Sequence, residues 1–432
     1  MKKFLNDSIS VGLSKVLIIV FGLATSIMTA RVLGPEKNGL IAALLVYPNI
    51  FMSFGSLGIR QSTTYLVGQK KYNDQEIKNS ITQIWLFSTI LGITICMLIM
   101  VNFIAVKHNV FLLVLAISPI PFKLFNTYNS GFFLGKNRIK EFNRINWVPP
   151  VSIFCATAIF LLMFDLSLEG YLFALIIGPL GVSIFLMSRD NLLYYLKLKI
   201  NVKIISKLMS LGLIYAFALL IINLNYKFDI IMLQKMSSMY ELGIYSKGAN
   251  ITQFLWQIPM LLSTIVFARS AISKNGREFS VKVAILLRFS FVFITIGSVI
   301  LWILSDYIII GMFGIEFSES VSVLNYLLPG VVLLTIYKVM NMDLAGKGKP
   351  WISIIAMVPA LILNIVLNYY YIPLYGADGS AIASTISYSV AAIIFLFLYS
   401  YAVKMPLREI IMYKKNDLIL FKQLFKILTK SK

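Results

Sequence analysis

The stretch ISVGLSKVLIIVFGLATSIMTA, residues 9–30, is mostly apolar and carries a single charged side chain, Lys15. A helix that crosses a bilayer needs about 20 consecutive, mostly apolar residues. Lys2 and Lys3 precede the stretch, as in a signal peptide, but the apolar region of a signal peptide is only roughly 7–15 residues long. The stretch therefore predicts a first transmembrane helix that is not cleaved.

Apolar runs of similar length recur along the whole chain. They predict transmembrane helices at residues 9–30, 39–59, 80–103, 110–133, 147–164, 169–188, 207–233, 240–268, 283–304, 319–344, 350–372 and 377–403. Hydrophobic residues make up 59% of the 432 residues and charged residues only 13%, against about 25% charged in a typical soluble domain. So few charges cannot cover a soluble fold of this length. The expected fold class is an all-α membrane protein with about twelve transmembrane helices in two six-helix bundles.

The basic residues indicate how the chain is oriented. Of the 39 Lys and Arg, 29 lie in the N-terminal segment, in alternate gaps between the predicted helices and in the tail at residues 404–432, and only four lie in the remaining gaps. Cytoplasmic loops carry the excess of Lys and Arg, so both termini are expected in the cytoplasm. The basic, amphipathic tail is expected to lie on the anionic cytoplasmic leaflet. Because the charges lie between apolar runs, the net charge of +21 does not indicate nucleic-acid binding.

A weak repeat relates the two halves of the chain. Gly135-Lys136 precedes the fifth predicted helix as Gly346-Lys347 precedes the eleventh, and Glu169-Gly170 begins the sixth as Asp378-Gly379 begins the twelfth. The repeat predicts two domains, at residues 1–200 and 201–403, followed by the tail at residues 404–432. Because six helices separate the repeats, the halves are expected to be related by a pseudo-two-fold axis along the membrane normal, with substrate bound between them.

Several motifs resemble those of Wzx-type polysaccharide flippases of the multidrug/oligosaccharidyl-lipid/polysaccharide exporter superfamily. The most specific is Gly346-Lys347-Gly348-Lys349-Pro350, followed by Leu363-Asn364, Leu367-Asn368 and Ile372-Pro373-Leu374-Tyr375-Gly376-Ala377-Asp378-Gly379-Ser380-Ala381. Similar matches are Ala30-Arg31-Val32-Leu33-Gly34-Pro35 before Gly39, Phe228-Asp229-Ile230-Ile231-Met232-Leu233 and Leu242-Gly243-Ile244-Tyr245-Ser246. Asn38 stands where the family commonly has Tyr. The matches span nearly the whole chain.

The resemblance implies a transporter of the bacterial inner membrane, not an enzyme. Its cargo would be an undecaprenyl-diphosphate-linked oligosaccharide for surface polysaccharides such as O-antigen or capsule, moved to the outer leaflet by alternating access. Membrane lipids, a coupling ion (Na+ or H+) and a polysaccharide polymerase are the expected partners. Three alternatives stay open: a small-molecule or drug exporter of the same superfamily, a peptidoglycan-precursor flippase, and a membrane-embedded glycan polymerase or ligase. Two extra helices are usual in the peptidoglycan-precursor branch.

Charges inside apolar helices are costly and mark candidate functional residues. Cations facing a cavity would neutralise a diphosphate cargo. The candidates for this role are Lys15, Arg31, Arg60, Lys123, Lys227 and Lys247. For Lys15, Arg31 and Arg60 the alternative is that the side chain reaches the membrane surface. Lys227 and Asp229 can also be an ion pair at a helix end.

Acidic and polar residues complete the candidate site. Asp229 and Asp343 are candidates for ion coupling. Asn250, Gln253 and Gln257 share one face of the eighth predicted helix and are candidate sugar contacts, although hydrogen bonds between helices would explain them equally well. The sequence shows no metal-ligand cluster, phosphate-binding loop or catalytic motif, so no cofactor and no metal are expected.

Overall fold

The computed structural model describes residues 2–69, 72–103, 109–136, 138–190, 201–273, 276–413 and Asp417. Two compact units divide the chain: the N-terminal unit, Lys2–Asn223, and the C-terminal unit, Leu224–Lys432. Their boundary falls inside one helix. The domain boundary expected at residue 200 stays a prediction, because residues 191–200 lie outside the described part of the chain.

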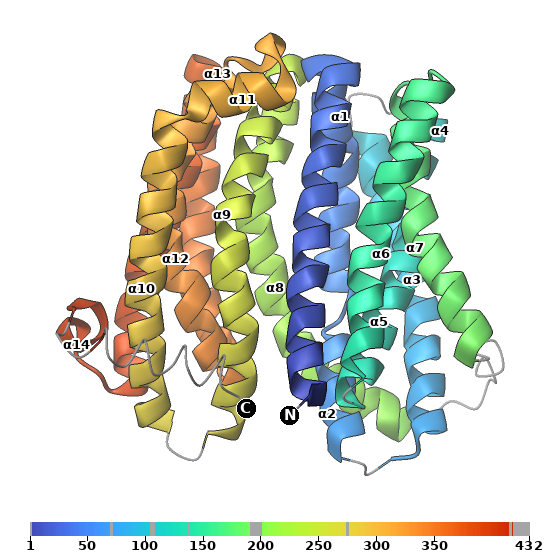
Figure 1. Ribbon diagram of the computed structural model, residues 1–432, viewed down its shortest axis with the longest axis vertical. Coiled ribbons are helices and arrows are strands. Elements are labelled where there is room, and N and C mark those ends of the chain that lie inside the picture. The colour runs from blue at the N-terminus through green and yellow to red at the C-terminus, as the bar shows by residue number, and fades with distance from the viewer. Residues whose placement is uncertain are drawn as a thin grey trace. The chain divides into compact units, whose positions relative to one another are not determined.

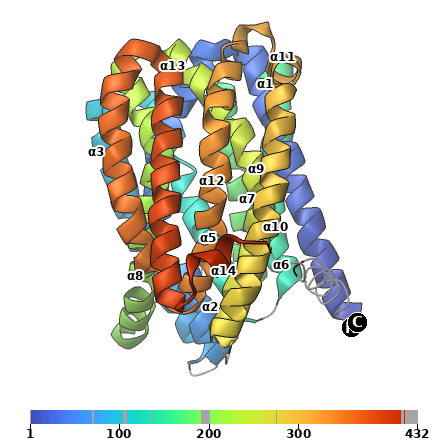
Figure 2. The same ribbon diagram turned by 90° about the vertical axis from the view of Figure 1, so that its left-hand side faces the viewer.

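The secondary structure of the described residues is helical (Figures 1 and 2). The first unit holds α1 (Lys2–Gly55), α2 (Ile59–Gln69), α3 (Asp74–Phe103), α4 (Val110–Ile117), α5 (Ile120–Gly135), α6 (Ile139–Ala158), the π-helical turn η1 (Ile159–Met163) and α7 (Leu168–Asp190). Next come α8 (Val202–Met236), which crosses the boundary, α9 (Met239–Ile272), α10 (Gly276–Ile303), α11 (Ser305–Phe313), η3 (Ile315–Phe317), α12 (Ser320–Gly346), α13 (Trp351–Val403) and α14 (Leu407–Ile411).

Two of these helices are bent into two limbs, and the bends explain their length. Gly34 has a φ of 69° inside α1 and Gly376 a φ of 54° inside α13, a left-handed region that glycine adopts readily. Among the described residues, nine helices are long and apolar enough to cross a membrane. Counting α1 and α13 as two each, and adding the 34-residue α9, gives the predicted twelve. Figure 2 shows the two limbs of α13 side by side.

Asn38 holds the bend in α1. Asn38 follows the bend, and its side-chain amide donates to the carbonyl oxygens of Thr29, before the bend, and of Gly34, at the bend, at 2.8 and 2.7 Å. Pro35, directly after Gly34, has no N–H to continue the helical ladder. A buried amide at position 38 thus links the two limbs of α1.

Small residues allow the helices of each unit to pack closely. In the N-terminal unit, a Cβ on Gly178 of α7 would lie 2.6 Å from the carbonyl oxygen of Pro149 in α6. In the C-terminal unit, a Cβ on Gly330 of α12 would lie 2.7 Å from the Cα of Thr385 in α13. Close approach through small residues is how membrane helices associate without a hydrophobic driving force between them. Within the C-terminal unit α12 packs against α9, α10 and α13.

Large apolar side chains cover the outside of the helices. Leu98 is 62% exposed, Met163 76% and Phe397 56%. A soluble protein rarely exposes so much contiguous apolar surface, whereas lipid covers it without cost. The chain is a multi-pass membrane protein.

Candidate functional site

Lys15 and Arg60 are the two candidate cations that the N-terminal unit brings together. Lys15 lies half-buried on the first limb of α1, and Arg60 is exposed at the start of α2. They are close enough for the charge of Arg60 to act on Lys15. Two like charges repel each other.

Tight backbone packing fixes the position of Arg60. The turn between α1 and α2 passes through Gly58, which has a φ of 57° and where a Cβ would lie 2.3 Å from the carbonyl oxygen of Gly212. Similarly, a Cβ on Gly131 of α5 would lie 2.5 Å from the carbonyl oxygen of Arg60. The Thr64 hydroxyl donates to the carbonyl oxygens of Arg60 and Gly131, at 2.7 and 3.1 Å. These contacts hold the start of α2 against α5 and α8.

The other two cations of this unit lie elsewhere. Arg31 is exposed near the far end of the first limb of α1, about 24 Å from Lys15 if each residue rises about 1.5 Å. Lys123 is half-buried on α5, and the hydroxyl of Thr127, one turn later, donates to its carbonyl oxygen at 2.8 Å.

A second candidate site surrounds Asp229 of α8, which is fully buried. Its Oδ1 accepts from the side-chain amides of Asn364 and Asn368, at 2.9 and 3.0 Å. Its Oδ2 accepts from the hydroxyls of Tyr245 and Ser384, at 2.7 and 2.6 Å. We call these five residues, with Ser380, the Asp229 cluster. Ser380 donates to Oδ1 of Asn368 at 2.7 Å.

Four neutral donors, two amide N–H groups and two hydroxyls, point at the Asp229 carboxylate. Such donors stabilise a buried carboxylate that has no cation hydrogen-bonded to it. Oδ1 of Asn364 is buried and has no hydrogen-bond partner. Lys227 is half-buried and lies close enough for its charge to interact with Asp229. In the described residues, no three His, Cys, Asp or Glu side chains come together as metal ligands.

Asp343, the other candidate for ion coupling, has a different environment. It is fully buried near the end of α12 and forms an ion pair with Lys347 at 2.7 Å. Ser270 of α9, Ser280 of α10 and Tyr399 of α13 donate to its carboxylate at 2.6, 2.8 and 2.8 Å. The carboxylate thus ties four helices together and already has a counter-ion. This geometry favours a structural role.

The remaining candidates, Lys247, Asn250, Gln253 and Gln257, lie on α9. Lys247 is buried, 5.5 Å from the ring centroid of Phe313. Along one face of α9, Gln253 is exposed while Asn250 and Gln257 are half-buried. Next to them, Trp256 contacts Tyr226 and Tyr388, and the ammonium of Lys338 lies 3.9 Å from the ring centroid of Trp256. Aromatic rings beside amides suit sugar contacts, and only the amides stood out in the sequence.

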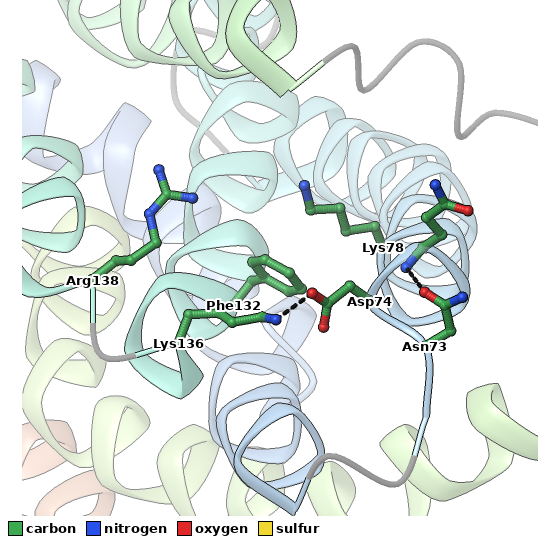
Figure 3. A pocket seen from close by; sticks show the side chains of 7 residues that line it. Asn73, Asp74, Lys78, Phe132, Lys136 and Arg138 are labelled. Carbon is green, nitrogen blue, oxygen red and sulfur yellow. Dashed lines mark hydrogen bonds and ion pairs between the residues drawn. The ribbon is translucent and has the colours of Figure 1, made fainter.

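Sequence reasoning also missed two charged clusters. Arg288, buried inside α10, pairs with Asp417 at 2.9 Å and donates to the carbonyl oxygens of Glu409 and Ile410, so it holds the segment after α13. Lys78, Lys136 and Arg138 line a pocket of ≈ 530 Å³ (Figure 3). The position of Arg288 within an apolar run is a signal that could have identified it. The three pocket cations lie in gaps between predicted helices, where basic residues indicate only the orientation of the chain.

Comparisons with known proteins are consistent with this architecture. A family model described as "Polysaccharide biosynthesis protein" matches residues 4–270. The chain is similar to a solved lipid II flippase MurJ in an inward closed conformation, with a TM-score of 0.73 and 18% identity over 99% of this chain and 93% of that one. No curated protein matches the chain in sequence.

Two further solved structures share the fold. One is an inward-facing multidrug resistance MATE family transporter of the MOP superfamily, with a TM-score of 0.69 and 15% identity over 90% of this chain and 94% of that one. The other is a MOP superfamily transporter from Pyrococcus furiosus, described as having a binding pocket of reverse polarity, with a TM-score of 0.68 and 14% identity over 92% and 94% of the two chains. The predicted fold class and the resemblance read from the motifs are confirmed.

Proposed function

Because this chain belongs to the polysaccharide biosynthesis protein family, we propose that it carries an undecaprenyl-diphosphate-linked oligosaccharide to the outer leaflet by alternating access. Its fold is shared by a flippase and by multidrug transporters, and the chain is a membrane transporter of that kind. The product would supply a surface polysaccharide such as O-antigen or capsule, and a polysaccharide polymerase would act on it next.

The observation that supports this proposal is that Lys15 lies inside a membrane helix where the charge of Arg60 also acts on it. A charge in the middle of a membrane helix costs at least about 2.5–3.5 kcal/mol, and a second cation nearby adds repulsion. A diphosphate between them would offset both costs, with Arg60 able to contact phosphate oxygens in a bidentate way and Lys15 acting as a point charge. Arg31, Lys123, Lys227 and Lys247 would contact the cargo at other stages of its passage.

Ion coupling is assigned to the Asp229 cluster. A buried carboxylate whose hydrogen-bond donors are all neutral is stabilised by binding Na+ or H+. Ion binding would then favour one arrangement of α8 against the two limbs of α13, which supply the ligands. Asn250, Gln253 and Gln257, with the aromatic rings around Trp256, would contact the sugars.

A drug exporter is the second candidate, favoured by the MATE-like fold. An organic cation would be repelled by Lys15 and Arg60, whereas a diphosphate would be attracted. The two functions therefore predict opposite charge selectivity. A lipid II-type cargo carries the same diphosphate, so charge selectivity does not separate it from the proposed cargo and only the sugar does.

The topology is also a proposal: both termini in the cytoplasm of the bacterial inner membrane. In a background lacking Cys96 and Cys155, a cysteine at Lys349 should resist an impermeant thiol reagent in intact cells, while one at Glu316 should react. Both residues are exposed on the C-terminal unit, so the inverse result would reverse the orientation.

Lys15 gives the test of the proposed function. Lys15→Ala should abolish surface glycan export at normal protein abundance, because the diphosphate loses a counter-charge within the membrane helix. Lys15→Arg should retain part of the activity. Lys37→Ala is the matched control, since Lys37 is an exposed cation that donates to the Ser167 hydroxyl at 2.8 Å. Normal export by Lys15→Ala would remove the main support for a cationic cargo site.

A further inference from the structure

A charged pocket on the N-terminal unit lies outside the sites described above. It is formed where α3 begins and where α5 meets α6, and Figure 3 shows its lining residues. We call it the cationic pocket: Asn73, Asp74, Gln75, Lys78, Phe132, Lys136 and Arg138, around ≈ 530 Å³. Three cations face one lining carboxylate, so the pocket is suited to an anion.

The cations are held in place by a ring and two carboxylates. The ammonium groups of Lys78 and Lys136 lie 4.8 and 5.6 Å from the ring centroid of Phe132. Lys136 pairs with Asp74, and Arg138 pairs with Glu141 at 3.1 Å. Among the lining residues, three side chains are basic and one, Asp74, is acidic. A lining of this composition attracts an anionic group.

An apolar groove of ≈ 410 Å³ adjoins the cationic pocket. Phe133, Trp147, Val148, Gly181 and Phe185, from α5, α6 and α7, are among the residues that line it. Phe133 follows Phe132 of the pocket in sequence, and the guanidinium of Arg138 lies 4.8 Å from the Phe133 ring centroid. Glu141, the partner of Arg138, also lines the groove. The two regions share no lining residue, but Arg138 of the cationic pocket contacts both Phe133 and Glu141 of the groove.

We propose that this place binds one anionic phospholipid of the cytoplasmic leaflet. The phosphate lies among Lys78, Lys136 and Arg138, and an acyl chain follows the groove past Gly181. Both loops of the pocket belong to the basic gaps that the charge bias assigns to the cytoplasm, where anionic headgroups concentrate next to basic residues. The proposal uses none of the cargo or ion-coupling residues, so it stands apart from the proposed function.

Lipid binding to the full-length protein tests the headgroup contact. Native mass spectrometry would follow phosphatidylglycerol and phosphatidylcholine of identical chains added to the delipidated protein. The variant Lys78→Gln/Lys136→Gln/Arg138→Gln should bind phosphatidylglycerol at least about tenfold more weakly, since each basic residue near an anionic headgroup contributes on the order of 1 kcal/mol. Arg277→Gln/Lys282→Gln/Lys349→Gln removes three exposed cations of the C-terminal unit and should bind as the unmodified protein does.

Gly181→Phe tests the acyl-chain contact separately. Gly181 lines the groove, and a Cβ there meets no atom within 4 Å, so the backbone position accepts a side chain, and a ring would occupy groove volume. The variant should lose phosphatidylglycerol binding yet keep its affinity for glycerol 3-phosphate and its melting temperature. Gly22→Phe, at another glycine with open space around its Cβ, is the control. Unchanged phosphatidylglycerol binding in Gly181→Phe would overturn the proposal, because the pocket would then bind the phosphate without the acyl chain. Equal binding of phosphatidylcholine and phosphatidylglycerol would also overturn it.

Discussion

Asp229 and Asp343 are both fully buried carboxylates, yet they differ in the charge of their partners. Asp343 has the ammonium of Lys347 at 2.7 Å, whereas the groups that donate to Asp229 are neutral amides and hydroxyls. The sequence predicts both as charges inside apolar helices. It cannot distinguish them, because the partners of Asp229 lie on α9 and on both limbs of α13. The Asn364 and Asn368 motif was visible in the sequence, but not its convergence on Asp229.

The two substitutions to Asn should therefore have different effects. Asp343→Asn leaves Lys347 without its counter-ion and should lower the free energy of unfolding by about 3 kcal/mol, the lower end for a broken buried pair. Asp229→Asn should cost less, because its hydrogen-bond partners are neutral, and it should make transport independent of the Na+ or H+ gradient. Thermal unfolding measures the first effect, and the rate of lipid flipping in vesicles with and without an imposed Na+ or H+ gradient measures the second. Gradient dependence that survives Asp229→Asn and disappears in Asp343→Asn would reverse the assignment.

The bends in α1 and α13 divide each of these long helices into two limbs. The bend in α13 is held by Glu241 of α9, whose carboxylate accepts from the N–H of Ala377 at 2.7 Å. It brings Asn364 and Asn368 on the first limb next to Ser380 and Ser384 on the second. Hydropathy predicts that one transmembrane helix ends at residue 372 and the next begins at residue 377. The contact with Glu241 cannot be predicted in this way, because it comes from a helix more than a hundred residues earlier.

Gly376→Ala should destabilise the C-terminal unit. A Cβ there would lie 2.6 Å from Oε2 of Glu241, and the left-handed backbone costs a residue with a Cβ about 1–2 kcal/mol. Gly22→Ala is the control, because its Cβ meets no atom within 4 Å and alanine favours a helix by roughly 0.5–1 kcal/mol over glycine. Thermal melting in detergent should rank Gly376→Ala below the unmodified protein and Gly22→Ala at or above it. Equal melting temperatures for the two variants would show that the bend tolerates a side chain.

At the scale of the whole molecule, hydropathy and charge predict the helices better than the site. Apolar runs of bilayer length leave few alternatives to a spanning helix, so the twelve helices and the fold class follow from the sequence. The site does not, because whether Lys15 meets Arg60, or Lys338 meets Trp256, depends on how helices are rotated about their axes. The residues of the predicted amphipathic tail that would contact lipid, from Ile419 to Leu428, lie outside the described residues. The symmetry axis between the halves stays a prediction.

The central claim is that this chain moves a diphosphate-linked glycolipid, and transport by the purified protein in vesicles tests it most directly. The substrate would be undecaprenyl-diphosphate-linked oligosaccharide, with its sugars detected by an impermeant reagent on one side. A matched lipid with the same chain and sugars but a neutral linkage serves as the control cargo. We expect flipping of the diphosphate lipid, loss of flipping in Lys15→Ala, and little flipping of the neutral lipid. Equal flipping of both lipids, or transport of an organic cation in their place, would contradict it.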